Sequence, residues 1–296
     1  MKLSVSILAL LLLAACNGGG GEVTEGNSSA AINRDAPYVW GNKSFPKVIR
    51  VSKDFSDPLE VAAMEAMAEK WKIAANGQDM ITMGSQLLTP FNYNEDDGIL
   101  GIYKAKVWPS DLTGNELAIT NLFCRRVNVG KSTEHLRIVE ADIIINYSND
   151  SRGRRNFDFD YDNVGTSGYD FQTVVLHEMG HFLGLNHIPE YSKRSDADWG
   201  MNSVDYKASS VMYPSVSSSI NKRDPQQRDI NELIYKYNLA PASSGSRMIA
   251  SSGDIYPEED IPGEFVKVVM ELKKDGECVH KHNGVVVERH NVKFKK

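Results

Sequence analysis

Residues 177–187 read His-Glu-Met-Gly-His-Phe-Leu-Gly-Leu-Asn-His, which matches the pattern H-E-x-x-H-x-x-G-x-x-H. His177 and His181 are four positions apart, so on an α-helix both rings lie on one face and can bind the same metal ion. Glu178 stands beside them, where its carboxylate can take a proton from water and later pass that proton to a leaving amine. The spacing therefore predicts metal-assisted hydrolysis.

The third ligand depends on a glycine. Gly184 has no Cβ, so it can adopt a left-handed conformation that ends the helix and returns His187 toward the metal. Three protein ligands leave one coordination position open, which is typical of one catalytic Zn²⁺ and not of a structural zinc. The alternative is a buried amphipathic helix whose histidines are satisfied by hydrogen bonds. It does not explain why the histidines share one face while the other faces are apolar, at Leu176, Phe182, Leu183 and Leu185. A zinc site that only binds the metal is a second alternative, and the presence of Glu178 argues against it.

The elements that must position these residues can be read from local patterns. Alternating apolar and β-branched stretches predict strands, and an Asp-Pro pair or Asp170 predicts where a helix begins. The fold class we expect is α+β, a strongly twisted mixed sheet with an active-site helix packed under it and a C-terminal helix. The strands are predicted at residues 45–52, 99–107, 117–123 and 138–147, and the helices at 59–75, from Asp170 onward, and at 224–237.

A second, smaller region follows this domain. Residues 241–263 are rich in Pro, Ser and Gly and are predicted to be a linker. Residues 264–296 then alternate between apolar and polar positions, with Asp275-Gly276 and Asn283-Gly284 as turn signals, which predicts a small three-stranded β meander. Such a meander is too small to be stable unless it is docked or disulfide-linked. His280 and His282 would point the same way in it and could hold a metal, although solvated surface histidines are far more common.

The amino terminus is typical of an exported protein. Residues 1–16 combine Lys2, a short apolar run and Leu-Ala-Ala-Cys, which predicts a signal segment too short to span a bilayer. The last four residues resemble a bacterial lipobox, and the resemblance implies that Cys16 becomes acylated and anchors the protein to a lipid membrane. Asn17 resembles the second residue of outer-membrane lipoproteins, which implies that the protein is sorted to the outer membrane of the cell envelope. The alternative is an ordinary secretory signal and a secreted protein.

The rest of the exported chain divides simply. Residues 17–36, rich in Gly, Ser and Asn, are predicted to be a flexible stalk, and residues 37–240 a single domain. The formal net charge of −6 and the absence of a long Lys/Arg stripe exclude nucleic acid as an expected partner. We expect a monomer. Cys124 and Cys278 could pair in an oxidising compartment and staple the tail to the domain.

Downstream of the zinc string, Met212 lies in Ser-Ser-Val-Met-Tyr-Pro, residues 209–214. The long zinc string followed by such a methionine turn resembles the metzincin clan of metallopeptidases. The likeness is greatest to matrixins, whose string also has glycine before the second histidine and whose turn also reads Met-Tyr-Pro. It covers roughly residues 45–237, strongly at these two motifs and loosely elsewhere.

This resemblance implies roles for further residues. Met212 would form a hydrophobic floor beneath the zinc, and Pro214 would begin the wall of the pocket that accepts the substrate side chain after the cleaved bond. Val216 stands where the family often has tyrosine. Asp158 and Asp160 precede the active helix as the family's acidic segment does, and their oxygen atoms would suit Ca²⁺, with a solvated acidic turn as the alternative.

The function expected from these observations is a zinc-dependent endopeptidase acting on extended protein or peptide substrates, with Glu178 as general base. The substrate would pair with an exposed edge strand at residues 117–123. Two alternatives stay open: a surface lipoprotein that binds partners and carries a non-catalytic zinc, and a zinc amidase acting on cell-wall peptides. No upstream cysteine segment that could mask the zinc is present.

Overall fold

The computed structural model describes most of the predicted domain and the tail that follows it. The signal segment with Cys16, the stalk, most of the linker and residues 190–207 lie outside the described residues. The described residues are 37–41, 45–87, 93, 96–131, 133–161, 168–187, 209–239, 263–274 and 276–292. They belong to one compact unit, Arg34–Lys296.

The fold is α+β, built on one mixed sheet of nine strands in the order β11-β10-β9-β5-β6-β4-β2-β3, with β1 also paired to β6. The strands β2, β3, β4 and β6 run parallel to one another, and β5 and β9 to β11 run antiparallel to their neighbours. The domain strands are β1 (Tyr38–Trp40), β2 (Lys47–Val51), β3 (Ile81–Met83), β4 (Gly101–Ala105), β5 (Glu116–Val127) and β6 (His135–Asn146). The predicted mixed sheet is confirmed, and the short β1 and β3 were not predicted.

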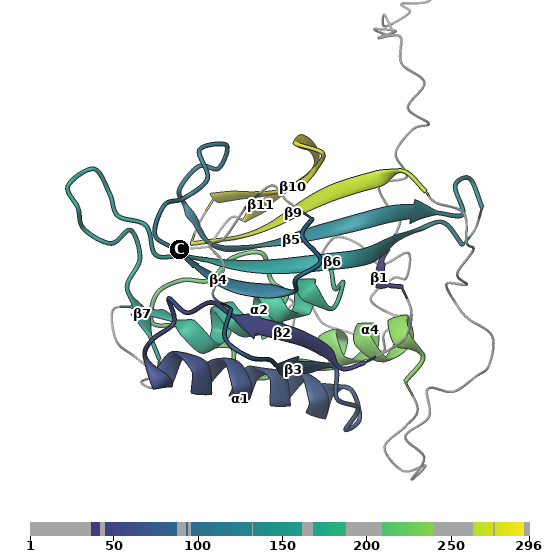
Figure 1. Cartoon of the computed structure of the whole chain (residues 1–296), viewed down its shortest axis with the longest axis horizontal. Coiled ribbons are helices and arrows are strands. Elements are labelled where there is room, and N and C mark those ends of the chain that lie inside the picture. The colour runs from purple at the N-terminus through teal and green to yellow at the C-terminus, as the bar shows by residue number, and fades with distance from the viewer. Residues whose placement is uncertain are drawn as a thin grey trace, which may run out of the picture. The chain divides into compact units, whose positions relative to one another are not determined.

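The helices of the described part of the chain lie on one side of this sheet (Figure 1). They are α1 (Pro58–Ala74), α2 (Phe171–Phe182) and α4 (Gln227–Tyr237). Asp57 caps α1 by accepting a hydrogen bond from Leu59 N at 2.9 Å, as the Asp-Pro signal predicted. The main apolar core fills the space between the helices and the sheet, with Trp71 of α1 fully buried in it. No helix in the described ranges is both long and apolar enough to cross a membrane.

The predicted start of the last helix was wrong by a few residues. The sequence suggested a cap at Asp224, but α4 begins after Gln226, which forms a capping box with Asp229. Asp224 instead forms an ion pair with Lys70 of α1 at 2.5 Å. The Asp-Pro signal therefore marks the approach to the helix and not its cap.

The predicted tail meander is confirmed and consists of β9 (Phe265–Lys273), β10 (Gly276–His282) and β11 (Val285–Val292). A short additional pair, β7 (Phe159–Asp160) and β8 (Tyr169–Asp170), precedes α2. The tail docks by pairing β9 antiparallel with β5, from Glu116 opposite Lys273 to Arg125 opposite Phe265. The prediction that residues 117–123 form an exposed edge is therefore wrong, because β9 covers this edge along its length (Figure 1).

The disulfide considered for the tail is also not formed. Cys124 and Cys278 are both buried free thiols. Cys124 lies on β5 opposite Val266, whereas Cys278 lies on β10 with β9 in between. Two strand spacings amount to about 9–10 Å, beyond the roughly 7 Å that a disulfide allows between Cα atoms. The tail is held by strand pairing and buried apolar side chains instead.

Candidate metal centre

Helix α2 presents the first two histidines and the glutamate. Asp170 caps the helix by accepting from Thr173 N at 2.9 Å, and the guanidinium of Arg223 holds the same carboxylate at 3.0 and 3.1 Å. On the buried side, Trp71 Nε1 donates to Leu176 O at 3.0 Å. The cap and this anchor fix where α2 begins and how it is rotated toward the sheet.

A glycine turn then returns the chain, as predicted. Gly184 has φ +80°, and a Cβ there would lie 2.4 Å from Tyr38 O, so both the backbone conformation and the available space require glycine. Lys236 of α4 fastens the turn, because its Nζ donates to Gly184 O at 2.6 Å and to Tyr38 O at 2.9 Å. The turn is thereby packed between β1 and α4, and it places His187 opposite the helix.

The three predicted histidines meet at one point. His187 Nε2 lies 3.1 Å from His177 Nε2 and 2.9 Å from His181 Nε2. For nitrogens bound at 2.0–2.1 Å around a tetrahedral ion, the expected nitrogen–nitrogen separation is about 3.3 Å. The rings therefore fit one metal ion, and they are the one group of three or more such donors found in the described part of the chain.

The opposite ring nitrogens are oriented by acceptors. His177 Nδ1 lies 2.6 Å from Val211 O, and His181 Nδ1 lies 2.8 Å from Leu185 O. These carbonyls assign the proton to Nδ1 and leave Nε2 free to bind a metal. Burial, with a contribution from His181, holds the pKa of His177 well below its usual range, so this ring is neutral.

The third ring, that of His187, is oriented by residues of the tail. His187 Nδ1 lies 2.9 Å from His280 Nε2, and His280 Nδ1 lies 3.2 Å from Glu288 Oε2. The chain of contacts assigns His187 as the donor to His280 and His280 as the donor to Glu288. His280 and His282 do share a face, as predicted, but both are buried and not solvated, at 1% and 2% exposure. His282 contacts Tyr38 Oη at 2.9 Å instead of a metal ligand.

Glu178 lies beside the three rings with one oxygen held and one uncommitted. Thr120 of β5 donates to Glu178 Oε2 at 2.6 Å. Glu178 Oε1 has no hydrogen-bond partner within the described structure, although the side chain is fully buried. Burial raises the pKa of Glu178 to about 8, against the lowering effect of the Thr120 hydrogen bond. An uncommitted buried carboxylate oxygen next to a metal-ligand set fits a group that handles a proton.

The methionine turn packs directly beneath α2. A Cβ on Gly180 would lie 2.3 Å from Met212 Sδ, so the glycine before the second histidine provides the space that the methionine occupies. Ser210 Oγ accepts from Met212 N at 2.9 Å and donates to Asp229 of α4 at 2.5 Å. The turn that supplies Val211 O to His177 is therefore tied to the last helix.

The two residues predicted to form a substrate pocket, Pro214 and Val216, are both buried. Val216 N donates to Lys273 O of β9 at 3.2 Å, and Ser215 forms a parallel bridge with Lys273. The segment after the methionine turn thus pairs with the tail. Neither this contact nor the contact of Thr120 with Glu178 was predicted from the sequence, because both join segments that are distant along the chain.

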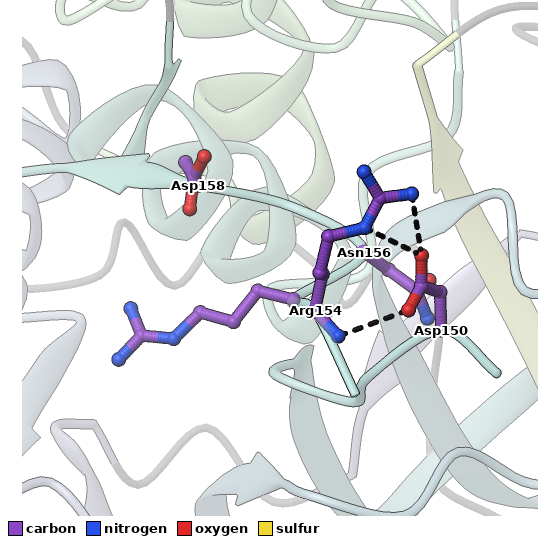
Figure 2. Close-up of a pocket in the computed structure, with 5 residues that line it drawn as sticks. Asp150, Arg154, Asn156 and Asp158 are labelled. Atoms are coloured by element: carbon purple, nitrogen blue, oxygen red, sulfur yellow. Dashed lines mark hydrogen bonds and ion pairs between the residues drawn. The ribbon is translucent and has the colours of Figure 1, made fainter. Parts of the chain in front are cut away.

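The predicted calcium residues lie elsewhere. Asp158 lines a polar pocket with Asp150, Arg154, Arg155 and Asn156. Arg154 pairs with Asp150, and Asp158 stands apart from that pair (Figure 2). Two arginines in the same pocket oppose the binding of a divalent cation there. Neither Asp158 nor Asp160 belongs to a group of three metal-binding side chains within the described ranges, and a calcium site stays a prediction.

No family model and no curated protein matches this chain when its sequence is compared with them.

Proposed function

We propose that the chain is a zinc-dependent endopeptidase with the matrixin-like form of the metzincin fold. The observation that carries the proposal is the meeting of His177, His181 and His187 through their Nε2 atoms, with the uncommitted Oε1 of Glu178 beside them. In this proposal Met212 is the floor beneath the metal, and the segment from Pro214 to Val216 is the wall of the pocket on the leaving-group side.

The chemistry divides between the metal and the protein. Zinc, when bound by the three histidines, supplies a Lewis acid that polarises the scissile carbonyl and acidifies water. Glu178 takes the proton from the attacking water through Oε1 and then delivers it to the nitrogen of the leaving amine. Thr120 holds the other carboxylate oxygen and leaves Oε1 available for the proton. The carbonyls of Val211 and Leu185 hold the rings of His177 and His181 in one orientation throughout the reaction.

A structural zinc in a partner-binding lipoprotein is the competing function, and the burial of the histidines favours it. Structural zinc sites are almost always closed by four protein ligands. Here the donor group in the described chain has three members. The absence of a fourth ligand among the described residues and the uncommitted oxygen of Glu178 favour catalysis. An amidase acting on cell-wall peptides would use the same groups on another substrate.

The proposal also places the enzyme outside the cytosol. By its resemblance to a lipobox, Cys16 would carry acyl chains that anchor the chain in the bacterial cell envelope, and the substrates would be proteins or peptides at that surface. Mass spectrometry of the mature amino terminus tests the anchor independently of the activity.

The experiment that tests the activity is hydrolysis of a quenched peptide library by the zinc-loaded protein, with and without a chelator. Because the histidines and Glu178 are buried, the assay is run in two forms. One is the intact chain, and the other is the chain cut within residues 241–262, from which the tail can separate. Glu178→Ala should bind zinc as before and lose hydrolysis by roughly 10²- to 10⁴-fold, the contribution typical of a general base. Glu65→Ala, which removes an exposed glutamate of α1, is the matched control.

Stoichiometric zinc without hydrolysis in either form of the chain would overturn the peptidase assignment in favour of a structural metal. Activity that survives in Glu178→Ala would remove Glu178 from its role. Release of amino groups from peptidoglycan fragments, but not from the library, would reassign the substrate and keep the chemistry.

A further inference from the structure

We propose that strand β9 is an internal pseudosubstrate, which fills the groove where an extended peptide would bind and keeps the enzyme latent until the tail is displaced. This inference rests on the proposed peptidase function. Its starting point is that His177, Glu178, His181 and His187 are each 1% exposed or less, so the structure leaves no approach for a polypeptide. A reacting carbonyl must come within about 3–3.5 Å of the attacking atom, which a closed site prevents.

The first observation is the pairing of β9 with β5. An extended substrate binds to a protease by adding a strand to a free sheet edge. In this chain the edge beside the metal is β5, because Thr120 of β5 holds Glu178. That edge is taken by β9 from Glu116 to Arg125 in antiparallel register, and Met270 lies opposite Thr120. The tail thus runs past the catalytic glutamate in the position that a substrate backbone would occupy.

The second observation is that β9 contacts the other side of the groove as well. Lys273 forms a parallel bridge with Ser215, and its carbonyl accepts from Val216 N at 3.2 Å. One strand is therefore held both by β5 and by the segment after the methionine turn. A bound peptide that crosses the metal would have to make the same two sets of backbone contacts.

The third observation concerns side chains. Met270 and Leu272 are 0% and 1% exposed and pack in the same core as the apolar side of α2. They fill the space in which substrate side chains would lie. On the other face, Lys273 Nζ pairs with Glu116 of β5 at 3.5 Å and with Glu271 at 3.0 Å. These buried contacts fasten the strand in place.

The same pairing explains how β9 can occupy the groove without being cut. Residues Val268 to Met270 pair with β10 on one edge and with β5 on the other, so β9 is an interior strand. Its carbonyls are engaged in ladder hydrogen bonds and cannot turn toward the metal. From β10, His280 also closes the site by contacting His187. A true substrate would lack the β10 partner that β9 has.

The first test keeps the chain intact. Lys273→Ala removes the ion pair to Glu116 and should raise hydrolysis of the peptide library several-fold over the unmodified chain. Lys274→Ala is the matched control, because this neighbouring ammonium stands 6.0 Å from the Phe157 ring centroid and not beside a β5 carboxylate. Binding of a peptide hydroxamate, measured by calorimetry on the zinc-loaded protein, should increase in parallel. This second readout does not depend on turnover.

The second test uses a specific protease site introduced within residues 241–262. Cutting there leaves both pieces in solution but removes the tether that keeps the tail at high effective concentration. Activity per molecule should then rise by about tenfold or more on dilution of the cut chain, and not on dilution of the intact chain. A synthetic peptide of residues 264–274 should restore latency, and the same peptide with aspartate in place of Met270 and Leu272 should not.

The outcomes separate the two proposals. An intact chain that hydrolyses peptides and binds the hydroxamate as well as the cut, diluted chain would overturn the pseudosubstrate role and leave the peptidase function standing. Zinc bound without hydrolysis in any form would overturn the peptidase function, and latency with it. If the cut chain unfolds, equal activity of Lys273→Ala and Lys274→Ala in folded, intact chains decides against the pseudosubstrate.

Discussion

At the scale of single residues, the site is defined as much by the groups that orient the histidines as by the histidines. Two of the rings are held by backbone carbonyls from nearby segments, Val211 O and Leu185 O. The third, His187, depends on a side chain almost a hundred positions away, His280, which is itself held by Glu288. Acceptors of this kind fix the tautomer of a ligand and raise its basicity.

Replacing His280 should therefore weaken metal binding. In His280→Ala, His187 loses its Nδ1 acceptor and its ring orientation, and the zinc dissociation constant of the intact chain should rise roughly 10- to 100-fold. Competition with a chelating dye measures the constant. Glu288→Gln should weaken zinc binding less than His280→Ala does, because an amide oxygen can still accept from His280.

His282→Ala is the matched control, since this histidine lies two positions along the same strand face and contacts Tyr38 rather than a ligand. Zinc affinity equal to that of the unmodified chain in His280→Ala, with the fold intact by circular dichroism, would show that the contact does not support the metal.

The residue scale also marks what sequence could and could not supply. The ligands, Glu178 and the Gly184 turn could be named from spacing, because each depends on geometry within a few turns of one segment. Met212 could be named from the resemblance of its turn to that of metzincins. Thr120 could not be named, and His280 could be named only as one of two histidines on a shared face and not as the partner of His187, because a period-two pattern says which side chains share a face and not which strand lies next to them. The mistaken free edge at β5 has the same cause.

At the scale of elements, α4 matters because it braces the two loops that complete the site. Lys236 holds the Gly184 turn, and Asp229 holds the methionine turn. Asp229 is fully buried and accepts from Ser210 Oγ at 2.5 Å, Val211 N at 3.2 Å and Gln226 N at 2.8 Å. The capping box that begins α4 and the loop beneath the metal thus share one carboxylate.

This sharing predicts the effect of Asp229→Asn. The substitution keeps the shape of the side chain but turns one acceptor into a donor that faces other donors. The free energy of unfolding, measured in urea, should therefore fall by about 1–3 kcal/mol. Zinc affinity should fall too, because Val211 O orients His177. Asp224→Asn removes an exposed ion pair just before the helix and should lower the free energy of unfolding by only about 0–1 kcal/mol. Equal losses in the two variants would contradict the bracing role.

At the scale of the whole molecule, ionisable groups from elements that are distant in sequence are brought together and buried. Asp142 of β6 is 3% exposed and accepts from Gly101 N at 2.9 Å. Glu140, Asp97 and Lys267 of β9 face it. Burial raises the pKa of Asp142 from 3.8 to about 8; the Gly101 hydrogen bond lowers it, Glu140 and Asp97 raise it further, and Lys267 lowers it. The folded chain therefore keeps a proton that the unfolded chain releases.

The sign of the resulting pH dependence follows from linkage. With a folded pKa above the unfolded value, the contribution of Asp142 to stability is fully present below pH 4 and is lost as the pH rises through 8. Asp142→Asn removes this loss, so the variant should gain stability relative to the unmodified chain between pH 5 and pH 9, by roughly 1–3 kcal/mol at the upper end. Urea midpoints measured across this range test the prediction.

The control is Asp79→Asn, at an exposed carboxylate, which reports the effect of removing one surface charge. A stability difference between Asp142→Asn and the unmodified chain that stays constant from pH 5 to pH 9 would show that Asp142 is ionised in the folded protein throughout.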